Sequence, residues 1–183
     1  MKNFIDQNFN GKTVMVRVDF NVPLNDKFEI TDDSRIKSVL PTIHKLLNDN
    51  AKVVLISHLG RPNGEEKRFS LKHLVSYLEK RINTKVYFSE NCIGEKVKKN
   101  LESLNFGEVL LLENLRFHKE EKNGDVEFAK QLSDLADVYV NDAFGTAHRN
   151  HASTSVITQF FPEEKYFGLL LKNEVDNLEI VLS

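Results

Sequence analysis

The sequence predicts an α/β fold: a three-layer α/β/α, Rossmann-like domain built around a parallel β-sheet. Short apolar segments of strand type alternate along the chain with segments whose apolar residues recur at helical spacing. Segment 52–56 is almost entirely apolar and rich in β-branched residues, which is typical of a fully buried strand. With 183 residues, the chain is long enough for one sizeable domain with its own hydrophobic core.

The first strand is expected at residues 13–18, and a helix is expected after it. Apolar residues from Ile36 to Leu46 recur at helical spacing, and three candidate N-caps precede them: Asp32, Asp33 and Ser34. Pro41 lies inside this pattern. Because proline has no backbone N–H and its ring clashes with the preceding turn, we expect a kink there or a helix that begins later than Ser34.

The rest of the chain continues the alternation. Further strands are expected at residues 52–56, 86–88, 109–112 and 138–140. Helices are expected between them, and their apolar faces are carried by Leu71, Leu74, Val75 and Leu78 after a Ser70 cap, by Val97, Leu101 and Leu104, and by Phe128, Ala129, Leu132 and Leu135. This alternation predicts βαβ units, with helices on both faces of the sheet.

The last helix is expected at residues 169–182, and it has an unusual end. The pattern stops at Ser183 with no Gly or Pro beyond it. The absence of a stop signal predicts a chain cut from something longer. A natural C-terminal helix that frays at its end is the alternative.

The composition excludes several classes of protein. A net charge of −2 argues against nucleic acid as the main partner, because nucleic-acid-binding proteins usually present a basic face. The single cysteine, Cys92, excludes a disulfide framework and a zinc site made only of cysteines, and it fits a reducing compartment. The N-terminus lacks the apolar core of a signal peptide, and no apolar segment approaches the length of a membrane span. We therefore expect a cytoplasmic protein with no membrane partner.

Polar residues follow the main strands, at the points where those strands end. The most informative stretch is Ser57–Pro62, which brings His58, Gly60 and Arg61 to the end of strand 52–56. The carboxyl ends of parallel strands meet at one rim of the sheet, where open α/β sheets bind their ligands. The other residues expected there are Asp19 and Asn21 after the first strand, Arg116 after strand 109–112, Arg149 after strand 138–140, and Arg35 from the start of the first helix.

Four arginines at one rim predict an anionic ligand. Arginine presents a planar fork that grips phosphate or carboxylate through two hydrogen bonds. These side chains would repel one another unless a multivalent anion lay among them, so a ligand with both a phosphate and a carboxylate fits best. Neither Gly-x-x-x-x-Gly-Lys-Ser/Thr nor Gly-x-Gly-x-x-Gly occurs in the chain, which therefore shows an anion site but no recognisable nucleotide site.

Other polar residues have more than one interpretation. Asp19 could bind a hydroxyl of the ligand or could serve as a helix cap or turn residue. Arg17 lies within the first strand and is interpreted as a structural partner of a carboxylate rather than as a ligand-binding residue. Asp142 could fix an arginine in place. The spacing of His148 and His151 resembles that of a metal or nuclease site, but nothing else supplies ligands, so no metal site is expected.

Taken together, these residues resemble the phosphoglycerate kinase family. The segments that carry the resemblance follow in the family's order and at its spacing: Arg17–Pro23, Ser57–Pro62, Leu112–Phe117, Asn141–Arg149 and Gly168–Leu171. The resemblance covers essentially the whole chain, but only one of the family's two lobes. It implies that residues 1–168 are the N-terminal, substrate-binding lobe and that residues 169–183 begin the helix between the lobes. The C-terminal nucleotide lobe is absent.

The resemblance also implies a role for each site residue. Four would hold the remote phosphate of 3-phosphoglycerate or 1,3-bisphosphoglycerate: His58, Arg61, Arg116 and Arg149. Asp19 and Asn21 would orient the hydroxyl group of the substrate. Arg35 would be catalytic, because it would lie near the carboxylate or acyl phosphate and stabilise charge on the group in transfer. Backbone groups of three further residues would line the same site: Phe20, Leu59 and Gly60.

The implied activity is reversible phosphoryl transfer between the acyl phosphate and ADP in glycolysis, by an enzyme that is monomeric at full length. No cofactor is expected in this chain. Magnesium with ADP or ATP is expected on the absent C-terminal lobe, so this fragment alone is expected to be inactive. The alternative function is a stand-alone, non-enzymatic anion-binding module, which the missing nucleotide motif and the complete-looking α/β core motivate.

Overall fold

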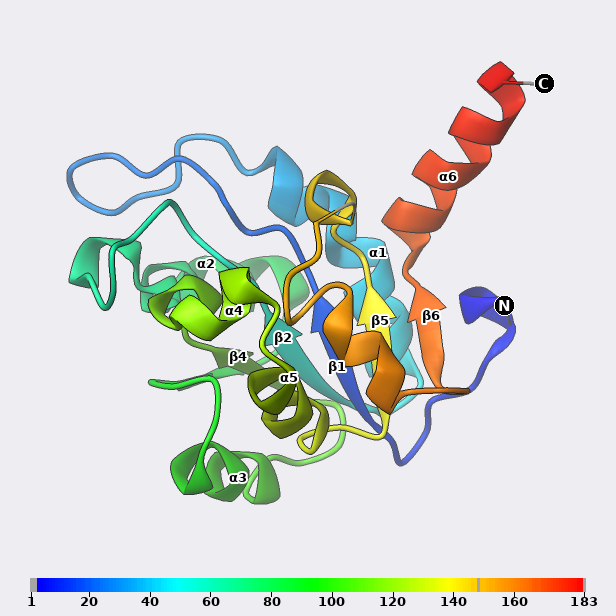
Figure 1. Ribbon diagram of the computed structural model, residues 1–183, viewed down its shortest axis with the longest axis horizontal. Helices are drawn as coiled ribbons and strands as arrows, with labels where there is room; N and C mark the ends of the chain where they lie inside the picture. The colour runs from blue at the N-terminus through cyan, green and yellow to red at the C-terminus, as the bar shows by residue number, and fades with distance from the viewer. Residues whose placement is uncertain (1–2, 148, 183) are drawn as a thin grey trace.

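The computed structural model describes residues 3–147 and 149–182, and a six-stranded sheet lies at its centre (Figure 1). In sheet order the strands are β3 (Val86–Ser89), β4 (Val109–Leu112), β2 (Lys52–Ile56), β1 (Thr13–Arg17), β5 (Val138–Asn141) and β6 (Lys165–Phe167). Each neighbouring pair is parallel. The predicted α/β fold with a parallel sheet is confirmed, and every strand expected from the sequence is present.

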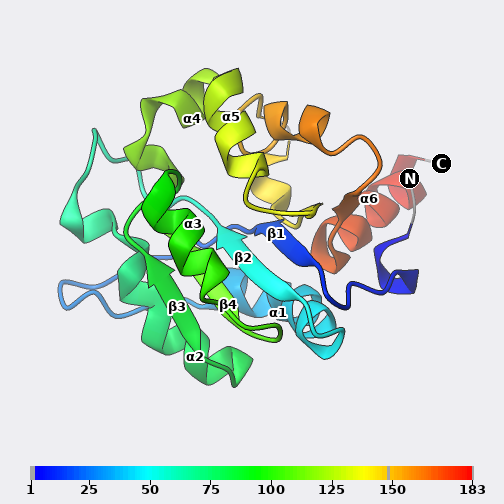
Figure 2. The ribbon, with the colours of Figure 1, turned by 90° about the horizontal axis from the view of Figure 1, so that it is seen from below.

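Helices cover both faces of this sheet (Figure 2). The helices on one face are α1 (Ser34–Asn48) and α2 (Val75–Ile82), and those on the other are α3 (Glu95–Glu102), α4 (Lys119–Asn123) and α5 (Val126–Ser133). α6 (Leu169–Leu182) follows β6 at the edge of the sheet and leads away from the body of the domain (Figure 1). Within residues 3–147 and 149–182, no helix is both long enough and apolar enough to cross a membrane.

Short 3-10 helices lie in the connections between these elements. They are η1 (Phe4–Asp6), η2 (Lys67–Phe69), η3 (Leu71–Leu74), η4 (Leu115–Phe117), η5 (Phe144–Thr146) and η6 (Val156–Phe160). Two of them bear on the sequence predictions. η3 begins the helix that the sequence expects after Ser70, whose hydroxyl accepts a hydrogen bond from the Lys72 N–H as predicted for a cap. η4 carries Arg116 at the carboxyl edge of the sheet.

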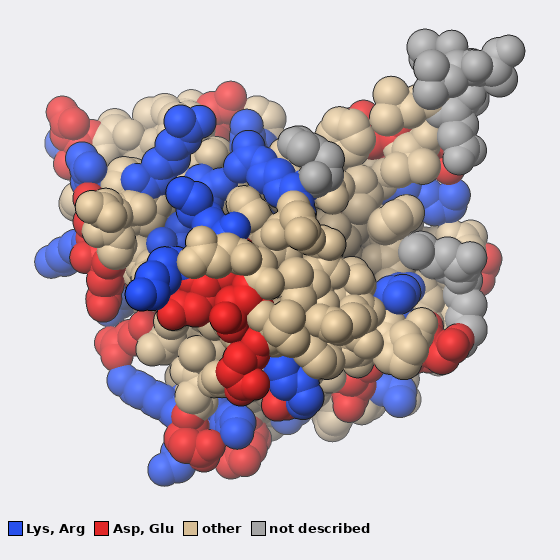
Figure 3. Space-filling view, in the orientation of Figure 1, with Lys and Arg blue, Asp and Glu red and all other residues tan. Residues whose placement is uncertain are grey.

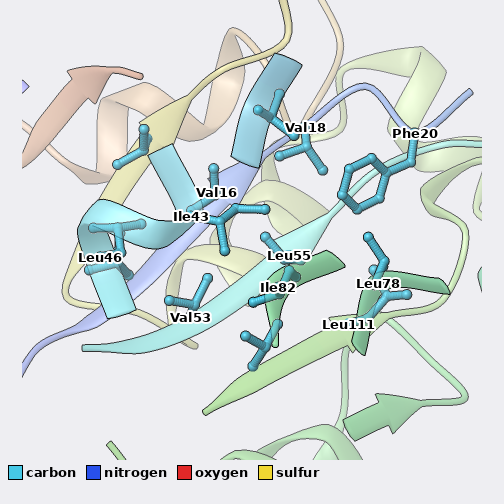
Figure 4. Packing of buried hydrophobic residues seen from close by; sticks show 14 of the residues in the cluster. Val16, Val18, Phe20, Ile43, Leu46, Val53, Leu55, Leu78, Ile82 and Leu111 are labelled. Atoms are coloured by element: carbon cyan, nitrogen blue, oxygen red, sulfur yellow. The ribbon is translucent and has the colours of Figure 1, made fainter. Parts of the chain in front are cut away.

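Alternate residues of the four central strands, β4, β2, β1 and β5, enter two separate hydrophobic cores. Val16 of β1 and Leu55 of β2 are fully buried and pack with Ile43 of α1 and Leu78 of α2 (Figure 4). Met15 belongs to the core on the opposite face, together with residues of α3 and α5. Burial of one such Val or Leu side chain contributes about 1.5–3 kcal/mol. Since both faces of the sheet are covered, its central strands are apolar on both sides.

The start of α1 differs from one of the two sequence expectations. The helix begins at Ser34 and runs through Pro41, so the expectation of a later start is wrong. Pro41 lies on the exposed side of α1, where solvent has access to the carbonyl that proline's missing N–H leaves without a helical partner. The opposite side of α1 is anchored in the core by residues such as Ile36 and Val39.

Two elements lack a signal in the sequence. α4 consists only of charged and polar residues, so it shows no apolar periodicity, and Gly124 ends it with a φ of 63°. β6 has three residues, of which only Tyr166 is buried, and its pairing with β5 makes it a strand. In both cases the tertiary contacts decide a structure that local patterning does not predict.

The start of α6 is fixed by side chains from the sheet and from α1. The Leu169 N–H donates to the Thr42 hydroxyl (2.9 Å), and the Leu171 N–H donates to Asp142 Oδ1 (3.0 Å). A Cβ atom on Gly168 would overlap the Asp142 carboxyl group, so glycine makes this close approach possible. The suggestion that Asp142 fixes an arginine is therefore wrong, because its carboxylate holds the first turn of α6 instead.

Candidate functional site

The central strands of the sheet end side by side. Arg17, the last residue of β1, pairs with Ile56 of β2 and with Asn141 of β5. The loops that follow these strands therefore start at one edge of the sheet, as predicted. Figure 3 shows Lys and Arg side chains gathered in its upper left part, on the side toward which the arrows of β1 and β5 point in Figure 1.

The loop that follows β2 is held by hydrogen bonds from the loop after β1. The Phe20 N–H donates to Ser57 Oγ (2.9 Å), and the Gly60 N–H donates to Asn21 Oδ1 (2.8 Å). Gly60 has a φ of 64°, and a side chain there would overlap the Phe69 ring. Only glycine fits this turn without strain.

Asn114 holds the same loop from the opposite side. Its amide accepts a hydrogen bond from the Leu59 N–H (3.2 Å) and donates one to the Leu59 carbonyl (2.8 Å). Arg116 Nη1 donates to the Gly60 carbonyl (2.8 Å). The backbone groups of Phe20, Leu59 and Gly60 thus maintain the loop's shape, and their direct role in lining a ligand site stays a prediction. The sequence motif contained Asn114 but gave no reason to assign it this function.

Of the two roles that the sequence left open for Asp19, the structure shows that of a turn residue, and binding of a ligand hydroxyl stays a prediction. Its Oδ1 accepts a hydrogen bond from the Asn21 N–H (3.1 Å), which makes it a turn residue. Its Oδ2 forms an ion pair with Arg35 Nη1 (2.7 Å), so a carboxylate orients this arginine toward the same edge of the sheet. The Arg35 side chain remains 53% exposed, and a guanidinium has donors beyond the one in this pair.

Basic side chains converge beside this loop. The pKa of the Arg116 guanidinium is lowered, first by its burial and then by the positive charges of Arg149, Arg17 and Arg61. Arg61 and Arg149 are exposed, whereas Arg116 is partly buried. Mutual repulsion among these cations favours the binding of an anion between them. The structure therefore brings together the arginines that the sequence places at the ends of three different strands.

His58 lies buried within this basic cluster and is 4% exposed. Burial, followed by the charges of Arg17, Arg116, Arg149 and His151, lowers its pKa from 6.5 to about 2. The imidazole is therefore neutral at physiological pH. It contributes a hydrogen-bonding group rather than a positive charge to the site.

Arg17 is buried, with an exposed fraction of 1%, and hydrogen bonds through a serine connect it to a carboxylate. Its Nε donates to Ser153 Oγ (2.9 Å), and the Ser153 hydroxyl donates to Glu121 Oε1 (2.6 Å). Burial raises the pKa of Glu121, and the positive charge of Arg17 opposes that rise. The interpretation of Arg17 as a structural partner of a carboxylate agrees with this arrangement. No sequence signal pointed to Glu121, because α4 has no apolar pattern that places its residues.

Of the two histidines that the sequence singles out after β5, the structure describes His151. His148 lies outside the described residues. His151 faces the basic cluster, and burial followed by the charges of Arg116, Arg149 and Arg17 lowers its pKa. Among the residues that the structure describes, no group of three or more His, Cys, Asp or Glu side chains is placed to hold a metal ion. From the sequence, His151 was interpreted only through its resemblance to a metal or nuclease site, and its position beside the basic cluster was missed.

Comparison with known proteins identifies relatives along almost the whole chain. The family model for phosphoglycerate kinase matches residues 4–183. The cytosolic phosphoglycerate kinase of Triticum aestivum is 54% identical over 168 residues, which are 92% of this chain and 42% of the relative. The phosphoglycerate kinase of Wolbachia pipientis wMel is 50% identical over 173 residues, 94% of this chain and 43% of the relative. The chain thus spans less than half the length of these relatives.

Solved structures show the same similarity in three dimensions. Phosphoglycerate kinase from Coxiella burnetii has a TM-score of 0.84 and 38% identity, covering 95% of this chain and 43% of that one. The enzyme from Pyrococcus horikoshii OT3 has a TM-score of 0.86 and 36% identity, covering 98% of this chain and 45% of that one. The fold, the residues at the carboxyl edge of the sheet and the extent of these matches agree: the chain belongs to the phosphoglycerate kinase family.

Proposed function

We propose that this chain is the substrate-binding half of a phosphoglycerate kinase and binds 3-phosphoglycerate or 1,3-bisphosphoglycerate at the carboxyl edge of its sheet. The observation that carries the proposal is the convergence of Arg116 and Arg149 beside the buried, neutral His58, with Arg61 close to Arg116. Family membership favours this function over a stand-alone, non-enzymatic anion-binding module.

The basic cluster has the chemistry that a phosphate requires. Arginine binds phosphate oxygens in pairs, and a charge-assisted hydrogen bond contributes roughly 1.5–3 kcal/mol. A few such bonds correspond to a dissociation constant of about 1 mM or lower. In this proposal the cluster holds the remote phosphate, and the Asp19 and Asn21 side chains orient the hydroxyl of the substrate.

Arg35 is the residue that we propose to be catalytic. Phosphoryl transfer asks a protein mainly to position the reactants and to stabilise charge on the group in transfer. A carboxylate nucleophile is ionised at neutral pH, so the site needs no general base. Arg35, which Asp19 orients by an ion pair of 2.7 Å, supplies a positive charge on a half-exposed side chain. Its guanidinium is therefore accessible to the carboxylate or acyl phosphate of a bound substrate.

The second substrate belongs to a part of the enzyme beyond these 183 residues. The relatives are more than twice as long as the aligned segment, since that segment covers 42–43% of their length. We propose that their remaining part binds magnesium with ADP or ATP, and that residues 1–168 form one lobe with the interlobe helix starting at residue 169. A monomeric full-length enzyme in the cytoplasm completes the proposal.

Isothermal titration calorimetry with 3-phosphoglycerate tests this function directly. We expect the folded chain to bind this ligand with a 1:1 stoichiometry. A Lys12→Ala variant serves as the control, because it also removes one positive charge but from an exposed position just before β1, at the opposite edge of the sheet. Absence of binding by a folded sample, or an equal loss of affinity in the control, would contradict the proposal.

A further inference from the structure

A series of buried hydrogen bonds ends at His58, and the donor and the acceptor of each bond can be assigned. The Glu121 carboxylate accepts from the Ser153 hydroxyl (2.6 Å) and from the Ser153 N–H (3.0 Å). With its only proton directed to Glu121, the Ser153 oxygen is an acceptor for Arg17 Nε (2.9 Å). Arg17 Nη2 then lies 3.3 Å from Nδ1 of His58. All four side chains are at least nine-tenths buried.

The chemistry of arginine decides what this last contact is. A guanidinium has five N–H donors and no acceptor, and it does not lose its proton in a protein. Nδ1 of His58 must therefore accept the hydrogen bond from Arg17. A neutral imidazole that accepts at Nδ1 carries its proton at Nε2. The geometry thus selects one of the two neutral tautomers before any ligand binds.

We propose that Arg17 is a positioning residue: supported by Ser153 and Glu121, it fixes His58 as the tautomer whose Nε2–H donates to the phosphate of the substrate. This inference rests on the proposed function, which supplies the phosphate. It adds three residues to the site that do not themselves contact the ligand. Removal of any of them would leave the histidine in place but with its proton free to occupy either nitrogen.

A fixed Nε2–H donor favours a fully ionised phosphate. The oxygens of a phosphate dianion are all acceptors, whereas a monoanion carries a proton that competes with the donor. His58 faces positive charges from Arg17, Arg116, Arg149 and His151, which together with burial hold its pKa far below neutrality. The donor therefore stays the same across the range in which the phosphate itself titrates, near pH 6.

Nitrogen-15 NMR of the imidazole ring in the ligand-free chain gives the first test. Between pH 5 and pH 8, we expect His58 to stay protonated at Nε2 and unprotonated at Nδ1, with no change in the tautomer population. In Arg17→Lys, which keeps the charge but loses the fork that reaches Ser153 and His58 together, we expect a mixture of both tautomers. A protonated Nδ1 or a tautomer mixture in the unaltered chain would overturn the inference, whether or not the variant folds.

A double-mutant cycle tests the consequence for binding. Arg17→Lys is expected to weaken 3-phosphoglycerate binding on the order of tenfold in the original chain and less than about twofold in a His58→Gln background, because glutamine has no tautomer to fix. Equal losses in both backgrounds would contradict a positioning role. Because the tautomer is measured without ligand, failure of the proposed function appears separately, as a folded chain with the expected tautomer that binds no 3-phosphoglycerate.

Discussion

Asp142 joins the sheet to α6: its Oδ1 accepts a 3.0 Å hydrogen bond from the Leu171 N–H in the first turn of the helix. Burial raises the pKa of this carboxyl, and hydrogen bonds from Thr42 and from the backbone of Leu171 and Leu170 oppose the rise. A buried side chain in the loop after β5 therefore defines the direction in which α6 leaves the domain.

Replacement of Asp142 tests this contact. Asp142→Ala removes the acceptor and leaves a buried N–H without a partner, so we expect the free energy of unfolding to fall by roughly 1–3 kcal/mol. Asp142→Asn keeps an acceptor oxygen and is expected to lose less. Urea denaturation followed by circular dichroism measures both variants. A larger loss in Asp142→Asn than in Asp142→Ala would show that the hydrogen bond is not the stabilising contact.

We expect even a methyl side chain at position 168 to lower the stability of the fold. A Cβ atom there would overlap the carboxyl group of Asp142, so Gly168→Ala should destabilise the fold by about 1–3 kcal/mol through overpacking. The same change made in Asp142→Ala should cost less, because the overlapping carboxyl atoms are gone. Thermal unfolding of the two single variants and the double variant measures this coupling, and strictly additive losses would argue against a steric cause.

The exposed arginines of the basic cluster are expected to determine affinity. Arg61→Ala and Arg149→Ala should each weaken 3-phosphoglycerate binding by tenfold or more, on the order of 1.4 kcal/mol, since each removes a charge-assisted contact. Both side chains are exposed, so the fold should tolerate these changes. Titration calorimetry against the Lys12→Ala control separates loss of a contact from loss of overall charge. Unchanged affinity in both variants would remove them from the site.

The buried His58 gives folding stability a defined dependence on pH. Its pKa is lowered from 6.5 to about 2 in the folded chain, so between these values the unfolded chain binds more protons than the folded one. Stability therefore rises with pH up to about 6.5 and is lost as the pH falls below it. His58→Gln should show a smaller loss between pH 7 and pH 4.5 in urea denaturation. His118 and His151 also have lowered pKa values and remain in both proteins, so the difference isolates His58.

The 183-residue chain alone is expected to form no ATP from ADP and 1,3-bisphosphoglycerate. Its sequence contains neither of the two glycine-rich nucleotide motifs, and its relatives are more than twice as long as the part that aligns. A coupled spectrophotometric assay measures this, with a full-length relative such as the Triticum aestivum enzyme as the positive control. Robust ATP formation by the chain would show that it contains a nucleotide site that its motifs do not indicate.

Local patterns predicted most of the architecture. The apolar segments 52–56 and 109–112 became β2 and β4 with the expected bounds, because strands buried on both faces need apolar residues throughout. α4 and β6 could not be predicted, because neither carries a periodic apolar face. Of the two expectations for Pro41, the later start of α1 was wrong, since the sequence does not reveal that this residue lies on the exposed side of the helix.

The sequence by itself determined which residues follow each strand and, through the rule that parallel strands end at one edge, that His58, Arg61, Arg116 and Arg149 would come together. Only the tertiary structure decided how they are held. Glu121 and Ser153 lie far from Arg17 in the sequence, yet in the fold they are buried beside it. Their hydrogen bonds set the donor and the acceptor at each step as far as His58. Local periodicity does not predict such contacts, because they join residues that are far apart in the sequence and come close only in the folded chain.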